Sequence, residues 1–199
     1  IVSKSTLQID SHRALGRREE ATDFGDMRLV GKYRFWKKYV EAALLAGIKF
    51  PTGETSERDS VGAKFHTEQQ PGTGSWDGEF GTVFSRNFFR RISIAQSFIY
   101  SLKSEGAQDE KLGDVFRYNI GAAFSLKKLG EHPNLSAVVE LNHEWASRDR
   151  SRTDEKVFDS GGTTIFLSPG VTANLTKNVS AFCAMPLPIY QNLGGEHEE

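Results

Sequence analysis

The sequence predicts an all-β fold, an antiparallel up-and-down transmembrane β-barrel. Three observations lead to this prediction: apolar and polar residues alternate with a period of two along most of the chain, the connections between alternating segments are short and long in turn, and aromatic residues gather at the segment ends. A period of two places every second side chain on the same face of a strand. No segment shows a long helical stripe of apolar residues, so strands are expected throughout.

Eight segments alternate clearly enough to be predicted as strands. They are residues 28–36, 39–50, 76–86, 91–101, 114–127, 135–146, 161–176 and 179–190. The fifth is the clearest, because the even positions from Phe116 to Leu126 are apolar and polar residues stand between them. The third and fourth are less regular, and Gln96 falls on an otherwise apolar face. Residues 1–11 alternate weakly, as one more strand would.

The composition agrees with strands and narrows the classes of function. The 199 residues include 14 Phe and 19 Gly but only 2 Met and 6 Pro, a bias that suits strands better than helices. With 25 Lys and Arg against 26 Asp and Glu, the net charge of -1 gives no bulk reason to bind nucleic acid. The single cysteine, Cys183, excludes an internal disulfide framework and a cysteine-based zinc site.

Strands with one apolar and one polar face fit either a soluble barrel or a membrane barrel. In a soluble barrel, apolar residues such as Phe116, Ile120, Leu141 and Leu175 would point into a core. In an outer-membrane barrel they would face lipid, and the polar residues would line the interior. No run approaches about 18 consecutive apolar residues, which excludes a membrane-spanning helix.

The connections and the aromatic residues favour the membrane barrel. Short turns are expected at 37–38, 86–90, 128–134 and 177–178, and long charged loops at 51–75, 102–113 and 147–160. Short turns at one end and long loops at the other are typical of outer-membrane barrels. Aromatic residues at both ends of the strands resemble the two interfacial girdles of such barrels. They are Phe35, Trp36, Tyr39, Phe88 and Phe89 at the turn end, and Phe50, Tyr100 and Trp145 at the loop end.

About nine strands can be counted, whereas single-chain bacterial barrels have an even number. We therefore expect ten to twelve strands in the complete protein. Residues 1–199 are interpreted as a single β-barrel domain that lacks the last strand, while a loss of N-terminal strands stays open.

Six turn segments rich in glycine or proline follow one another along the chain. They are Phe24-Gly25-Asp26, Phe50-Pro51-Thr52-Gly53, Gln70-Pro71-Gly72-Thr73-Gly74-Ser75-Trp76-Asp77, Ser160-Gly161-Gly162, Leu167-Ser168-Pro169-Gly170 and Pro186-Leu187-Pro188-Ile189-Tyr190-Gln191-Asn192-Leu193-Gly194-Gly195. In this order they resemble the family named for the MetA-pathway of phenol degradation, bacterial outer-membrane barrels regarded as transporters. The resemblance spans residues 24–195. It implies a barrel in the bacterial outer membrane, and its link to aromatic-compound catabolism says little about the function.

The polar face of the predicted strands holds the candidate lumen-lining residues. They are Arg28, Lys32, Arg34, Glu41, Lys49, Glu79, Arg117, Asn119, Glu140, Asn142 and Glu144. Two interpretations stay open: these charges pair across the lumen and fill it, as side chains do in small barrels, or they line a narrow polar path with weak ion selectivity.

Two of the long loops offer further candidates. The segment 148–156 is dense in both charges, and Arg148, Arg150 and Arg152 either engage lipopolysaccharide phosphates by charge-assisted hydrogen bonds or belong to a solvated extracellular loop. The loop 51–75 is long for a hairpin, and such loops are often functional. It either folds inward and narrows the lumen or projects from the barrel.

No catalytic, metal or cofactor site is predicted. The five His residues lack the spacing of metal ligands, and Gly72-Thr73-Gly74 is a turn rather than a phosphate loop because no helix pattern follows it. The expected function is therefore passive passage of small solutes, aromatic or otherwise hydrophobic ones included. Outer-membrane lipid, lipopolysaccharide and the solute are the expected partners, and nucleic acid is not. The alternatives are a structural barrel that holds a partner protein and a soluble barrel that binds an apolar ligand.

Overall fold

The computed structural model describes residues 24–58, 62–65 and 67–194, and these form one antiparallel sheet. Its strands are β1 (Met27–Lys37), β2 (Glu41–Phe50), β3 (Asp77–Phe88), β4 (Ile92–Leu102), β5 (Val115–Ser125), β6 (Asn134–Ala146), β7 (Gly162–Asn174), β8 (Ser180–Ala184) and β9 (Leu187–Leu193). Two short 3-10 turns, η1 (Thr67–Gln69) and η2 (Ala107–Asp109), lie in connections. No helix in the described ranges has the length and apolar character needed to cross a membrane.

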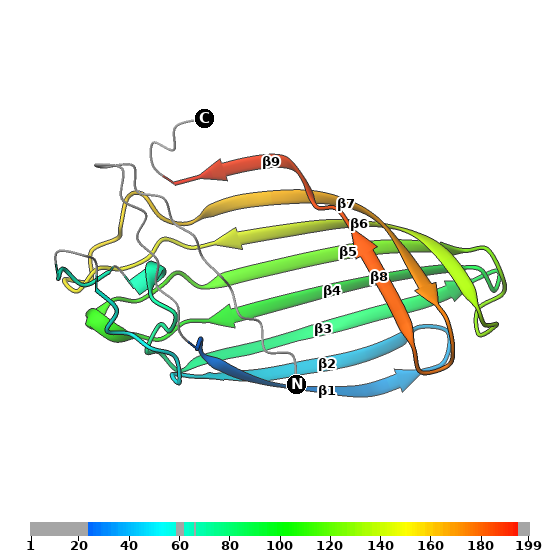
Figure 1. Cartoon of the computed structure of the whole chain (residues 1–199), viewed down its shortest axis with the longest axis horizontal. Coiled ribbons are helices and arrows are strands. Elements are labelled where there is room, and N and C mark those ends of the chain that lie inside the picture. The colour runs from blue at the N-terminus through cyan, green and yellow to red at the C-terminus, as the bar shows by residue number, and fades with distance from the viewer. Residues whose placement is uncertain (1–23, 59–61, 66, 195–199) are drawn as a thin grey trace.

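The strands run up and down in sequence order, each one pairing with the next from β1 to β8 (Figure 1). The all-β, up-and-down fold predicted from the alternation is therefore confirmed. Each predicted strand from residue 28 onward overlaps an observed one, with bounds that differ by a few residues. The weak segment 1–11 lies outside the described residues.

The predicted single strand 179–190 is wrong in one respect, because it is broken into β8 and β9. Both pair with β7: Ser180–Ala184 lies beside Gly170–Asn174, and Leu187–Leu193 beside Gly162–Leu167. Pro186 and Pro188 have no backbone N–H to give to a ladder, which interrupts regular pairing at this point. One hydrogen bond, from the Met185 amide to the Pro169 carbonyl at 3.0 Å, keeps the intervening chain beside β7.

All three long connections lie at one end of the sheet, as predicted. They are residues 51–76, 103–114 and 147–161, and we call this the loop end. The connections 38–40, 89–91, 126–133 and 175–179 lie at the opposite, turn end. In Figure 1 the loop end is on the left, and the sheet curls so that β8 crosses in front of the middle strands.

The two faces of the sheet differ sharply in chemistry. The face that carries Lys49, Asp77, Glu79, Ser101 and Arg117, here called the inner face, holds buried polar side chains. Among the described residues the buried apolar ones are few and mostly small, namely Ala42, Ala43 and Val115. The sheet is thus held mainly by its ladders and by polar contacts on the inner face, without a large apolar core.

The opposite, outer face is apolar and exposed. Ile120 at the middle of β5 is 37% exposed and Leu175 is 52% exposed. Phe116 and Leu141 share this face, because they lie opposite Trp145 and Ile120 in the ladder. The soluble-barrel alternative, which requires these four side chains to form a core, therefore disagrees with the structure. Gln96 does lie on the apolar face, opposite Phe84 and Ile120.

Aromatic side chains of the outer face contact one another across neighbouring strands toward the loop end. Phe80 and Tyr100 have ring centroids 5.8 Å apart, Phe98 and Tyr118 4.8 Å, and Phe116 and His143 6.4 Å. Cross-strand aromatic pairs of this kind stabilise a sheet.

Candidate functional site

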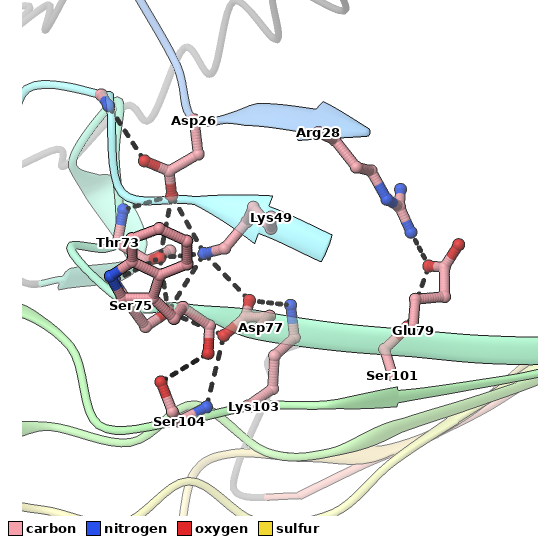
Figure 2. A network of polar contacts seen from close by, with 12 residues as sticks. Asp26, Arg28, Lys49, Thr73, Ser75, Asp77, Glu79, Ser101, Lys103 and Ser104 are labelled. Carbon is pink, nitrogen blue, oxygen red and sulfur yellow. Dashed lines mark hydrogen bonds and ion pairs between the residues drawn. The ribbon is translucent and has the colours of Figure 1, made fainter. Parts of the chain in front are cut away.

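Polar side chains on the inner face form three layers, and the first layer lies at the loop end. It is a chain of alternating charges, Asp26, Lys49, Asp77 and Lys103 (Figure 2). The Lys49 ammonium lies 2.9 Å from a carboxylate oxygen of Asp26 and 2.9 Å from one of Asp77. The Lys103 ammonium lies 2.9 Å from the same oxygen of Asp77. Every charge in this layer therefore has an opposite charge beside it.

The register of the strands brings these charges together. Lys49 is the next-to-last residue of β2 and lies directly opposite Asp77, the first residue of β3. Side chains directly opposite each other in a ladder point to the same face. Asp26 immediately precedes β1, and Lys103 immediately follows β4. Four strand ends thus supply one layer.

Asp26 ties both ends of the 51–76 connection to the sheet. Its carboxylate accepts hydrogen bonds from the backbone amides of Gly53 and Thr73, each at 3.0 Å, and from the Thr73 hydroxyl at 2.9 Å. Lys49 also donates to the Thr73 hydroxyl and, at 3.0 Å, to Ser75. Residues 73–75 therefore lie against the loop end of the inner face, directly before β3, and the inward folding of the rest of the loop stays a prediction.

These contacts also set the acidity of Asp26. Burial acts to raise the pKa of this carboxyl, but the hydrogen bonds from the Thr73 amide, from Lys49 and from the Gly53 amide outweigh it. The net effect is a pKa below the ordinary value. Asp26 is therefore held as a carboxylate that binds the loop.

The long connections also bind one another. The Ala107 amide donates to the Thr73 carbonyl at 2.8 Å, and the Thr67 hydroxyl donates to Glu110 at 2.5 Å. Lys111 and Arg150 exchange two backbone hydrogen bonds of 3.0 and 2.8 Å. The connections 51–76, 103–114 and 147–161 thus form one hydrogen-bonded unit, which we call the loop cap.

The second layer draws its side chains from five strands. Arg28 on β1 pairs with Glu79 on β3, and Glu79 accepts a hydrogen bond from Ser101 at 3.2 Å (Figure 2). Arg117 donates to Ser101 at 3.4 Å and to Glu144 at 2.6 Å. Arg28 lies directly opposite Lys49 on β2, and its guanidinium reaches past this strand to Glu79 on β3.

The third layer is uncharged. Asn119 donates to Ser97 at 3.2 Å, Asn142 donates to Asn119 at 3.1 Å, and Ser168 donates to Asn142 at 2.9 Å. Toward the turn end, the hydroxyls of Ser125 and Ser136 lie 2.8 Å apart. A continuous hydrogen-bonded lining therefore follows the wall from β4 to β7.

Nine of the eleven predicted lumen-lining residues take part in these layers or in a separate ion pair, Arg34–Glu41 at 3.1 Å. The side chains of Lys32 and Glu140 form neither an ion pair nor a hydrogen bond with the described residues. Glu140 instead occupies the space beside Gly121, where an added Cβ would lie 3.0 Å from the Glu140 Cγ.

The other members of the layers were not among the lumen-lining residues predicted from the sequence. They are Asp26, Thr73, Ser75, Asp77, Ser97, Ser101, Lys103 and Ser168. Asp77 is the second residue of the predicted strand 76–86, so pairing it with the end of the preceding strand would have placed it beside Lys49. For Lys103 and Thr73, which lie in connections, no periodic pattern gives a signal.

The predicted loop arginines contact different partners. Arg150 pairs with Asp154 at 2.9 Å, Arg152 pairs with Asp109 at 3.1 Å, and the Arg148 guanidinium lies 5.2 Å from the centroid of the Phe158 ring. Their binding to lipopolysaccharide stays a prediction. No group of three or more His, Cys, Asp and Glu residues in the described part of the chain is arranged to hold a metal ion.

The geometry can be set beside known proteins. No curated protein matches the chain significantly. Residues 4–185 match the family described as "Putative MetA-pathway of phenol degradation". Because this match covers most of the 199 residues and agrees with the all-β, up-and-down structure, the chain belongs to the MetA-pathway of phenol degradation family.

Proposed function

We propose that the protein is a β-barrel of the bacterial outer membrane that lets small solutes pass without energy coupling. The observation that carries this proposal is the distribution of side chains on the sheet: hydrogen-bonded polar residues on the inner face and exposed apolar residues on the outer face. This is the reverse of a soluble barrel and matches the alternation of outer-membrane barrels.

The outer face supports the membrane location. Large apolar residues exposed on it extend from β1 to β9, among them Leu29, Leu44, Phe80, Val139 and Leu187. Soluble monomers rarely expose contiguous apolar surface on this scale. Lipid tails would cover it, and the aromatic residues near the loop end would lie at the headgroup level.

The inner face supports passage. Each ion pair between predicted lumen-lining residues joins strands that are neighbours or next neighbours in the sheet, such as Arg117 and Glu144 on β5 and β6. These pairs lie along the sheet, and within the described ranges none of them links strands farther apart than next neighbours. A wall neutralised in this way favours a polar path with weak ion selectivity. The family description makes phenolic and other aromatic solutes the first ones to test.

We propose that this protein carries out no catalytic step. Its proposed partners are outer-membrane lipid, lipopolysaccharide and the solute. The rival role is a structural barrel that holds a partner protein. That role predicts a stoichiometric partner that stays bound during purification in detergent.

The test has two stages. The full-length protein extracted from outer membranes is first run on a denaturing gel with and without boiling, and a closed barrel is expected to migrate faster when unboiled. Purified protein is then reconstituted in liposomes, and the influx of phenol, benzoate and glucose is measured against empty vesicles. Influx at the level of empty vesicles, despite a heat-dependent gel shift, would overturn the channel function while leaving the barrel intact.

A further inference from the structure

A cavity of about 580 Å³ opens at the loop end, where the 103–114 and 147–161 connections meet the ends of β6, β7 and β9. Its volume lies in the range of small-molecule sites. Four of its described lining residues are cations, Lys111, Arg148, Arg150 and Lys156, whereas Asp114 is the one acid among them. The cavity therefore has a strongly positive wall in a chain whose overall charges balance.

Three of these cations lie in register across three chain segments. Lys111 is bridged to Arg150, and Arg150 is bridged to Lys156, both in antiparallel orientation. Directly opposite residues in antiparallel segments present their side chains on the same side, about 5 Å apart. Lys111 and Arg150 exchange two backbone hydrogen bonds. Arg150 and Lys156 exchange none, and in antiparallel segments such a non-hydrogen-bonded pair has its side chains closer together.

Like charges placed directly opposite one another destabilise a sheet. Nearby acids compensate the positive charges that line this cavity only in part. Arg150 pairs with Asp154, whose side chain is 79% exposed, and the Lys111 ammonium is 3.8 Å from Asp114. Arg148 lies over the Phe158 ring, and Lys156 forms no ion pair with any residue that the structure describes. An anion in the cavity would offset this repulsion by charge-assisted hydrogen bonds.

We propose that this cavity binds the oxyanion group of a small solute, a carboxylate or a phosphate, through Lys111, Arg150 and Lys156. Trp145 lines the same cavity and would contact the body of the solute. The site is separate from the Asp26–Lys49–Asp77 layer on β1–β3. It requires no passage through the barrel, so it can be tested apart from transport.

The test measures anion binding by the fluorescence of Trp145. In the full-length protein refolded in a neutral detergent, Trp36→Phe and Trp76→Phe leave Trp145 as the remaining tryptophan of the 199 residues. Inorganic phosphate and benzoate are titrated separately at constant ionic strength maintained with chloride. We expect saturable fluorescence changes that weaken at higher salt, because exposed charges are screened.

The decisive variant carries Lys111→Gln and Lys156→Gln in that background. Its affinity for phosphate is expected to fall by about tenfold or more, since one hydrogen bond to a charged group is worth that factor. The matched control, Lys127→Gln and Lys128→Gln, removes the same charge from the turn end and should bind like the parent protein. The gel shift on boiling verifies that each variant is folded.

Three results would overturn the proposal. The first is the absence of a saturable fluorescence response to either probe. The second is an equal response in the Lys111/Lys156 variant. The third arises in vesicles of phosphatidylcholine with and without lipopolysaccharide: a Trp145 response to lipopolysaccharide, combined with none to phosphate or benzoate, would replace the small solute with a lipid headgroup.

Discussion

At the scale of single residues, Lys49 is the cation on which the loop-end layer depends. It lies between two largely buried carboxylates, Asp26 and Asp77, whose side chains are 7% and 5% exposed. Lys49→Met would leave both acids without their shared partner. Removing one member of a buried ion pair is costly, so we expect the free energy of unfolding to fall by about 3 kcal/mol. Urea unfolding in lipid vesicles measures this change.

Lys32→Met is the matched control for Lys49→Met. Lys32 lies on the same face of the sheet but is exposed and forms no ion pair with the described residues. Its replacement is expected to change the free energy of unfolding by at most about 0.5 kcal/mol. Equal losses in the two variants would show that the Lys49 contacts contribute nothing specific.

Acid should weaken the attachment of the loop through Asp26. Because the pKa of this carboxyl is lower in the folded protein than its ordinary value, Asp26 contributes stability above about pH 4 that is lost as the pH falls through the folded pKa. Asp26→Asn should be less stable than the parent at pH 7, and the difference should shrink on acidification. Unfolding midpoints of both proteins at pH 7, 4 and 3 test this, and a difference that does not change with pH would contradict it.

The residues of the first two layers show what a sequence can and cannot indicate. Arg28, Lys49 and Glu79 were predicted from their inward positions, because alternation assigns a face to every residue of a strand. Their pairing was not, since a face says nothing about register. Arg28 lies opposite Lys49 on β2 yet pairs with Glu79 on β3, a contact that depends on three strands at once.

At the scale of elements, the loop cap depends on a close approach of two glycines. A Cβ added to Gly72 would lie 2.5 Å from the Gly53 carbonyl carbon and 2.6 Å from its Cα. Gly72→Ala should therefore push the two halves of the 51–76 connection apart, at a cost of about 1–3 kcal/mol. The expected result is faster cleavage of this loop by added protease in lipid vesicles.

Gly78→Ala is the control for the loop variant, because an added Cβ at Gly78 meets no atom within 4 Å. The rate at which protease cleaves the 51–76 connection of Gly78→Ala should match the rate for the parent protein. Unchanged cleavage in Gly72→Ala would mean that the glycine contact does not fasten the loop.

The strands were predictable because period-two alternation continues through each of them. The break between β8 and β9 was not, although Pro186 and Pro188 stood inside the predicted strand and mark a position that cannot donate to a ladder. The loop cap was also missed. Its contacts, such as Thr67 with Glu110, join residues in connections that carry no periodic signal and lie far apart in sequence.

At the scale of the whole molecule, the proposal depends on which solvent each face meets. Ile120 and Asn119 are neighbours on β5 that point to opposite faces: Ile120 is 37% exposed, and Asn119 belongs to the third polar layer. In water, a lysine at an exposed position such as 120 would cost little. In lipid it would lie near the bilayer centre and cost about 2–4 kcal/mol.

Ile120→Lys is therefore expected to lower the yield of folding into lipid vesicles, read from the band that shifts on boiling. Asn119→Lys loses hydrogen bonds to Ser97 and Asn142, but it should fold better than Ile120→Lys, since its charge lies on the inner face, where water and the acids Glu144 and Glu140 of the neighbouring strand are within reach. If the barrel conducts, this added cation should move the reversal potential in a salt gradient toward anion selectivity. Normal folding of Ile120→Lys would show that the outer face does not lie against lipid. Normal folding of Asn119→Lys with an unchanged reversal potential would instead show that ions do not pass along the inner face. One added charge in a narrow polar path must alter which ions enter it.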